Sequence, residues 1–293
     1  MLLLIQRQPD RLQKLISGLR KQGKSVGFVP TMGALHEGHG ALVRASRREC
    51  DITVVSIFVN PAQFGPKEDW GRYPRPVSAD IAALKKWKAD ILFHPAVKAV
   101  YPEGFNTVVQ TGAGHRMKGK PSLQSALCGP FRPGHFDGVC TVVCKLFNTV
   151  MPDRTYFGQK DYQQAVILKA MIRDLNLRID LRMIPTVREN DGLAMSSRNR
   201  YLSARERQSA VLLSKALFEV SRKLQSGGSS INKIKTGTMA FLKAGGLRVQ
   251  YLDIVDPDTL AKVIRRQKRM VVAAGCYVGK TRLIDNVIIR IPI

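Results

Sequence analysis

Short apolar runs alternate with amphipathic stretches along the first two thirds of the chain. The runs at residues 26–29, 52–59, 90–93 and 155–158 are rich in branched and aromatic side chains, which is typical of strands buried on both faces of a sheet. Helix-like stretches follow three of them, at residues 41–48, 81–88 and 163–175. This alternation predicts an α/β fold with a mostly parallel sheet and right-handed crossovers.

The pattern changes after about Pro185. Ser203 and Glu206 have the spacing of a capping box, which predicts a long amphipathic helix from there to about Leu224. A second predicted helix at residues 231–243 is ended by Gly245-Gly246. The β-rich segments after it are residues 249–255, 270–273 and 283–291. We therefore predict two domains, residues 1–186 and a smaller α+β C-terminal domain of residues 187–293.

Composition favours a soluble cytoplasmic protein. No apolar run approaches the ~20 residues of a membrane-spanning helix. The opening run Met1-Leu2-Leu3-Leu4-Ile5 is too short for the core of a signal peptide, and we interpret it as a first strand. Five cysteines without a Cys-x-x-Cys pair favour reduced thiols in the cytoplasm.

The formal net charge of +25 attracts polyanions, so nucleic acid has to be considered as a partner. The positive residues are spread along the chain, however, with only a modest cluster at residues 265–269. No zinc-finger spacing, basic zipper or RNP-type aromatic motif accompanies them. A solvated basic surface is therefore the favoured interpretation, nucleic-acid binding is disfavoured, and the sequence gives no reason for the charge.

Two histidines follow the first buried run, where a helix is predicted to begin. A helix N-terminus offers unpaired N–H groups and positive potential to a phosphate. His36 and His39 stand three residues apart, so they project from one side of the first turn. Two imidazoles placed there can donate hydrogen bonds to phosphate oxygens while charge builds on a leaving pyrophosphate.

Three other interpretations of these histidines compete with phosphate binding. A lone histidine is usually structural. A His-x-x-His pair can hold zinc, but Glu37 is the only further ligand nearby. A dinucleotide site is disfavoured because Gly-x-Gly-x-x-Gly is absent. The His-x-Gly-His element after Pro30-Thr31-Met32-Gly33 resembles instead the signature of the nucleotidylyltransferase superfamily, which implies a Rossmann-like sheet.

Polar residues after two other buried runs are further candidates. Ligands of open α/β sheets bind outside the carboxyl ends of strands, where Asn60 and Gln63 are expected. Turn chemistry explains these two residues equally well. Lys160 stands beside a predicted helix start, where a cation suits a phosphate or carboxylate, although Asp161 and Gln164 there have the spacing of a simple capping box.

A polar loop lies at the predicted domain boundary, at residues 188–199. Its hydroxyls, its backbone amides and Arg198 can clamp a triphosphate. The loop resembles the Met-Ser-Lys-Ser segment that accompanies the His-x-Gly-His element in the superfamily. An ordinary loop is the alternative, and the pairing of the two motifs makes it the weaker one.

Five segments together resemble the pantothenate synthetase (pantoate–β-alanine ligase) family. They are Pro-Thr-Met-Gly-Ala-Leu-His-Glu-Gly-His (30–39), Ser-Ile-Phe-Val-Asn-Pro-Ala-Gln-Phe (56–64), Arg-Pro-Gly-His-Phe-Asp-Gly-Val (132–139), Gly-Gln-Lys-Asp-Tyr-Gln-Gln (158–164) and Asp-Gly-Leu-Ala-Met-Ser-Ser-Arg-Asn-Arg-Tyr-Leu (191–202). They follow the family's order and spacing, whereas the C-terminal part is similar mainly in length and pattern. Gln159 departs from the Glu that the family often has, and the basic charge is unusual for it.

The resemblance implies a ligase that makes pantothenate, a coenzyme A precursor, in two steps. Pantoate and ATP give pantoyl adenylate and pyrophosphate, and β-alanine then displaces AMP. The resemblance also implies Mg²⁺ carried with ATP rather than by protein side chains, and a homodimer. Residues 1–186 would bind the nucleotide and pantoate, and residues 187–293 would close over ATP.

The resemblance further implies individual contacts. His39 corresponds to the proton donor, and His36 and Lys160 act with it in catalysis. Gln63, Gln164 and Asn60 would bind pantoate, and Gln63 also β-alanine. The expected ATP contacts are Met32, Gly33, Ala34, Leu35, His36, Glu37, Gly38, His39, Gly158, Gln159, Lys160, Asp161, Val187, Met195, Ser196, Ser197 and Arg198.

These residue types suit the chemistry, because a carboxylate is ionised at neutral pH and attacks phosphorus without a general base. The sequence does not identify the group that deprotonates β-alanine, or the roles of His94, His115 and His135. Two rival functions stay open. One is another small-molecule nucleotidylyltransferase, which should lack the Gln63 and Gln164 segments, and the other is a basic nucleic-acid-binding protein.

Overall fold

The computed structural model describes residues 3–66, 68–111 and 122–291, so His115 lies outside the described residues. The chain forms two compact units. The first comprises Met1–Thr111, Pro133–Gly158 and Ile167–Pro185, and the second Gly112–Arg132, Gln159–Val166 and Thr186–Ile293, as far as these are described. The last change of unit along the chain falls between Pro185 and Thr186.

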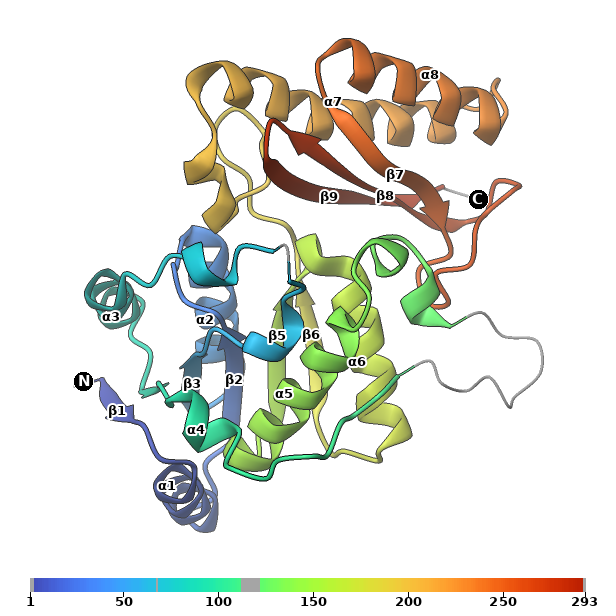
Figure 1. The fold of residues 1–293 in the computed structure, drawn as a ribbon. Helices are drawn as coiled ribbons and strands as arrows, with labels where there is room; N and C mark the ends of the chain where they lie inside the picture. Colours follow the sequence, from blue (N-terminus) through green and yellow to red (C-terminus); the bar gives the residue numbers. More distant parts are fainter. Residues whose placement is uncertain (1–2, 67, 112–121, 292–293) are drawn as a thin grey trace. The chain divides into compact units, whose positions relative to one another are not determined.

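The first unit is built on a parallel sheet with the strand order β1-β4-β3-β2-β5-β6 (Figure 1). The strands are β1 (Leu4–Gln6), β2 (Val26–Thr31), β3 (Ile52–Ile57), β4 (Ile91–Phe93), β5 (Arg154–Gly158) and β6 (Asp180–Ile184). Every pairing between neighbours is parallel. The predicted Rossmann-like α/β architecture is therefore confirmed.

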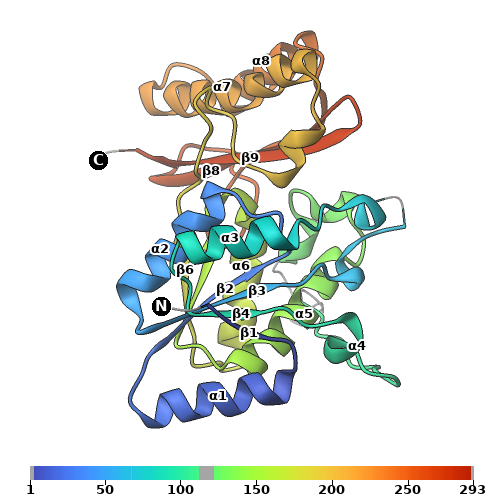
Figure 2. The same ribbon diagram turned by 90° about the vertical axis from the view of Figure 1, so that its left-hand side faces the viewer.

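Helices cover both faces of this sheet. They are α1 (Pro9–Lys21), α2 (Glu37–Glu49), α3 (Val77–Lys86), α4 (Val97–Val100), α5 (His135–Val150) and α6 (Tyr162–Asp174). Successive strand residues face opposite sides: Phe28 meets Phe147 of α5, whereas Val29 packs in one cluster with Val43 of α2 and Leu84 of α3. Accordingly α2 and α3 lie on one face, and α1 and α5 on the other (Figure 2).

The second unit contains a three-stranded antiparallel sheet, in the order β7-β8-β9, with two helices packed on it (Figure 1). Its elements are α7 (Ala204–Ser226), α8 (Ile231–Ala244), β7 (Arg248–Val255), β8 (Arg269–Val278) and β9 (Thr281–Arg290). The predicted capping box is present, because Glu206 N–H donates to Ser203 Oγ and Ser203 N–H to the Glu206 carboxylate. The smaller α+β fold is thus confirmed. Among the described residues, no helix has both the length and the apolar character that crossing a membrane requires.

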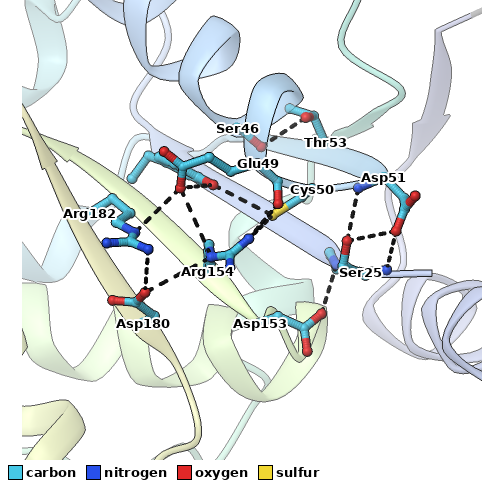
Figure 3. A network of polar contacts seen from close by, with 12 residues as sticks. Ser25, Ser46, Glu49, Cys50, Asp51, Thr53, Asp153, Arg154, Asp180 and Arg182 are labelled. Carbon is cyan, nitrogen blue, oxygen red and sulfur yellow. Dashed lines mark hydrogen bonds and ion pairs between the residues drawn. The ribbon is translucent and has the colours of Figure 1, made fainter. Parts of the chain in front are cut away.

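An ionic network ties the C-terminal end of α2 to β5 and β6 (Figure 3). Arg182 lies 3.3 Å from Glu49 and 3.0 Å from Asp180, and Arg154 reaches the same two carboxylates at 4.0 and 3.9 Å. These side chains are about one third to one half exposed, so each pair contributes little by itself. Together they fix the end of α2 that is remote from His36 and His39.

Candidate active site

The turn between β2 and α2 has a strained backbone held by a buried carboxylate. Gly33 and Ala34 both have positive φ, of 83° and 51°, and the second is unusual for a residue with a side chain. Asp80 of α3 is 2% exposed and accepts hydrogen bonds from Ala34 N–H at 2.9 Å and Leu35 N–H at 2.7 Å. A Cβ on Gly33 would lie 3.0 Å from Asp80 Oδ2, so glycine suits both the conformation and the space.

Asp80→Ala should lower the free energy of unfolding by about 3 kcal/mol, because it leaves two N–H groups without their acceptor inside the protein. Denaturant unfolding followed by circular dichroism measures this change. Asp10→Ala is the matched control, since Asp10 is an exposed acid in the first turn of α1. Equal losses in the two variants would contradict the role of Asp80.

His36 and His39 hold each other's backbone at the start of α2. His36 is the N-cap, and its Nδ1 accepts from Gly38 N–H at 3.2 Å. His39 Nδ1 accepts from His36 N–H at 3.2 Å, and the two ring centroids lie 4.2 Å apart. The two imidazoles therefore lie side by side at the start of α2, as the sequence predicts.

The two caps determine which nitrogen carries the proton. A ring nitrogen that accepts a hydrogen bond cannot carry hydrogen, so in each neutral imidazole the hydrogen resides on Nε2. Both rings are therefore Nε2–H donors, and an imidazolium would have to give up its cap. Donors with a fixed orientation can stabilise the charge that develops on a phosphate oxygen.

Asn60 and Gln63 form one connected group after β3. Asn60 is 1% exposed; its amide group donates to Gln63 Oε1 and Gly138 O, both at 3.1 Å, and its Oδ1 accepts from Ala62 N–H and Tyr101 Oη–H. Its hydrogen-bonding capacity is used within the protein. Asn60 thus orients Gln63, and its predicted direct contact with pantoate stays a prediction.

Gln63 itself is half-buried and is held from two further sides. Its Nε2 lies 2.9 Å from the Met32 sulfur, and its backbone carbonyl lies 2.7 Å from His135 Nδ1. The role of His135, which the sequence leaves open, is to support the backbone at Gln63 through this contact; the ring is 8% exposed.

His94 is partly buried. Burial is the main cause that lowers its pKa, and the charge of Arg7 is the second.

The turn after β5 carries Lys160. Residues Gln159–Asp161 form a short 3-10 turn leading into α6, and Lys160 Nζ lies 3.8 Å from the Asp161 carboxylate. Gln164 is half-buried, whereas the neighbouring Gln163 is 5% exposed and bonds Leu123 O, Ala126 O and Cys128 N–H. Gln163 therefore fastens the segment before α5.

The loop at residues 187–198 is closed by its own backbone and by Arg207. Met195 N–H donates to Val187 O at 3.0 Å, and Arg207 pairs with Glu189 and Asp191, each at 2.7 Å. Ser196 Oγ accepts from Arg198 N–H at 3.3 Å and so starts the turn Ser197–Tyr201. Hydroxyl, amide and guanidinium groups are thereby gathered in one short turn.

The buried thiols are unsuited to act as nucleophiles. All five cysteines are free, and Cys128, Cys140 and Cys276 are buried. Burial raises the pKa of Cys140 and of Cys276 to about 12, so both stay protonated at neutral pH. Within the described parts of the chain, no three His, Cys, Asp or Glu side chains form a group that could hold a metal ion.

The predicted site residues fall into two groups. Met32 to His39, Asn60, Gln63 and Gly158 belong to the first unit. Gln159 to Asp161, Gln164, Val187 and Met195 to Arg198 belong to the second. The sequence missed Asp80, because it is the fourth residue of a helix that begins at Val77 rather than at the predicted residue 81.

Comparison with known proteins gives one consistent result. Residues 4–288 match the family model of pantoate–β-alanine ligase. The pantothenate synthetase of Sulfurihydrogenibium sp. (strain YO3AOP1) is 50% identical over 281 residues, which cover 95% of this chain and 97% of that protein. That of Thermosipho africanus (strain TCF52B) is 47% identical over 280 residues, covering 96% and 98%.

Solved structures agree with this result. The crystal structure of pantothenate synthetase from Thermus thermophilus superposes with a TM-score of 0.89 at 42% identity, covering 97% of this chain and 99% of that one. Pantoate–β-alanine ligase from Francisella tularensis, complexed with β,γ-ATP and β-alanine, gives 0.78 at 32% identity, with 98% and 97% covered. The chain belongs to the pantoate–β-alanine ligase family.

Proposed function

We propose that this protein condenses pantoate with β-alanine to form pantothenate, with cleavage of ATP to AMP and pyrophosphate. The observation that carries the proposal is the capped pair His36 and His39, which presents two Nε2–H donors at the start of α2 in a chain whose residues 4–288 match the ligase family. The Francisella relative was crystallised with β,γ-ATP and β-alanine.

In the first step a pantoate carboxylate oxygen attacks the α-phosphorus of ATP, and pyrophosphate leaves. The nucleophile is already ionised, so the protein has to align it and neutralise charge on the leaving group. Nε2–H of His36 and His39 can donate to the phosphate oxygens, and His39 is the family's proton donor. Lys160 and Arg198 are the proposed sources of positive charge for the triphosphate.

In the second step the β-alanine nitrogen attacks the acyl carbon of pantoyl adenylate, and the bond to AMP breaks. The anhydride is reactive, so water has to be kept away. We propose that residues 187–293 close over ATP for this purpose, whereas residues 1–186 bind the nucleotide and pantoate. Residues 193–291 share one hydrophobic core and residues 3–184 contain another, which supports the division into two domains.

Mg²⁺ enters with ATP in this proposal. Magnesium prefers phosphate and water oxygens and rarely occupies an all-protein cage, so the phosphates of ATP are its proposed ligands. The protein is proposed to act in the cytoplasm, which the five unpaired thiols support. A homodimer is proposed from the family alone, and light scattering on the purified protein tests it.

Gln63 and Gln164 are the proposed pantoate contacts, and Gln63 also meets β-alanine. Gln63→Ala should raise the KM for pantoate about 10- to 100-fold, because one or two hydrogen bonds to a charged ligand are lost, and change the KM for ATP less. Steady-state kinetics with each substrate varied in turn measures both values. Gln8→Ala, an exposed glutamine before α1 without a side-chain cap bond, is the control. If the KM for pantoate is unchanged, Gln63 does not bind pantoate and serves only to form the turn.

The overall reaction is tested by product analysis. Purified protein incubated with ATP, Mg²⁺, pantoate and β-alanine should form pantothenate and AMP in equal amounts, detected by mass spectrometry and nucleotide chromatography. Omission of either acid should stop pantothenate formation. Formation of ADP instead of AMP, or no dependence on pantoate, would overturn the proposal.

A further inference from the structure

Strand β9 carries two adjacent buried polar residues whose contacts reach two of the ATP-binding segments. Asp285 is 3% exposed and Asn286 is 2% exposed. Consecutive residues of a strand point to opposite faces of its sheet, so the two side chains serve different neighbours. We infer that Asp285 and Asn286 are positioning residues that hold the Lys160 turn and the loop before Ser196 in their ATP-binding conformations; this inference rests on the proposed function.

Asn286 fixes the Lys160 turn through its backbone. Its Nδ2 donates to Gln159 O at 2.9 Å and to Lys160 O at 3.0 Å. Its Oδ1 accepts from Gln159 Nε2 at 3.1 Å. Three bonds from one buried amide therefore hold two consecutive residues, and they fix the backbone from which the Lys160 side chain starts.

The same contacts account for the side chain of Gln159. Gln159 Nε2 donates one of its two hydrogens to Asn286 Oδ1, so the side chain of Gln159 is turned toward β9. A buried amide is costly to fold unless it is fully hydrogen-bonded. The Asn286 amide satisfies this condition through the turn alone, because both of its donors and its acceptor bond Gln159 and Lys160.

Asp285 fixes the other segment through Arg188. The guanidinium donates two hydrogen bonds to the carboxylate, at 2.7 and 3.1 Å, and a third to Gly192 O at 3.1 Å. Arg188 also lies over the Phe218 ring, 4.8 Å from its centroid. This bidentate ion pair anchors the start of the loop that leads to Met195 and Ser196.

The two anchors are linked to each other. Asp285 Oδ1 also accepts from Asn286 N–H at 2.8 Å. A shift of β9 at this point would therefore move the Lys160 turn and the Arg188 loop together. Supporting contacts of this kind matter for rate, because a misplacement of about 1 Å can cost on the order of 100-fold.

Asn286→Asp tests the inference with no change in size. The substitution replaces an amide donor by a carboxylate oxygen facing two carbonyl oxygens, so the turn has to move. We expect kcat for pantoate-dependent pyrophosphate exchange into ATP to fall about 100-fold. If Asn286→Asp does not fold, Asn286→Ala takes its place in the assay, because it removes the donors without adding repulsion. Asn232→Asp, an exposed Asn on α8, is the matched control and should keep the full rate.

A double-mutant cycle separates positioning from general stability. If Asn286 acts through Lys160, Asn286→Ala should slow exchange strongly in the unchanged protein but less than about 3-fold in a Lys160→Ala background. Equal losses in both backgrounds, or a wild-type rate in the folded Asn286 variants, would overturn the inference alone. A wild-type protein without pantoate-dependent exchange would overturn the proposed function and the inference with it.

Discussion

His39→Asn is expected to slow pantoate-dependent pyrophosphate exchange by about 100- to 1,000-fold, the usual effect of removing one donor to a developing charge. The Asn side chain can still accept from His36 N–H, as His39 Nδ1 does at 3.2 Å, so the start of α2 keeps its cap. It is too short to present a donor where Nε2–H stands. Exchange kinetics and thermal unfolding of the same preparation measure the two effects.

His39→Gln provides the opposite variant. Gln can place an N–H near the position of Nε2 but does not reproduce the cap, so it should lose about 1 kcal/mol of stability and retain more activity than His39→Asn. If His39→Asn instead retains more activity than His39→Gln, the role of His39 is only to cap the helix. The same comparison applies to His36, where Asn is a preferred N-cap residue.

Lys160→Ala is expected to reduce kcat/KM for adenylate formation by about 100- to 1,000-fold, because the proposed positive charge on the triphosphate is lost. The Lys160 side chain is 21% exposed and is directed by the turn that Asn286 holds. Its removal leaves no buried partner unpaired, since Asp161 is half exposed, so thermal unfolding should change little. Single-turnover formation of the adenylate measures the loss.

Lys169→Ala is the control for this variant, since Lys169 is an exposed lysine on α6. It removes the same charge without touching the turn and should keep the full rate. A large loss in Lys169→Ala would attribute the effect to net charge. A wild-type rate in Lys160→Ala would remove Lys160 from catalysis.

Strands whose runs are buried on both faces could be predicted, such as β3, in which all six residues are buried. Helix α1, edge strand β6 and helix α5 are among the elements that were missed. Edge strand β6 is polar, with Asp180 and Arg182 in ion pairs, and has no apolar run. Helix α5 is rich in Val, Thr and Cys, which have low helix propensity, and only its packing against the sheet accounts for it.

The parts of the site whose residues lie close together in the sequence could be predicted. His36 and His39 occur within four residues, so one turn of helix places both. The supporting residues act over long separations: Asp80 reaches Ala34 across 46 residues, and Asn286 reaches Lys160 across 126. No short pattern records such a contact, because it depends on how the strands and helices pack.

The basic charge is likewise gathered only by the fold. Separate stretches of α2 and the α3 end line one groove of about 680 Å³ with Arg44, Arg47, Arg48, Lys86 and Lys88 around Glu37 and Trp87. Glu37 pairs with Arg44 at 3.1 Å and accepts from Trp87 Nε1 at 3.3 Å. Along the sequence these cations stand in two groups that are about 40 residues apart.

The most direct measurement is the exchange of labelled pyrophosphate into ATP by the unmodified protein, with Mg²⁺ and without β-alanine. Reversal of adenylate formation predicts rapid exchange with pantoate and essentially none with other small carboxylic acids or without acid. Equal exchange with every acid, or none with pantoate, would contradict the claim that a capped histidine pair at the start of α2 promotes attack of pantoate on ATP.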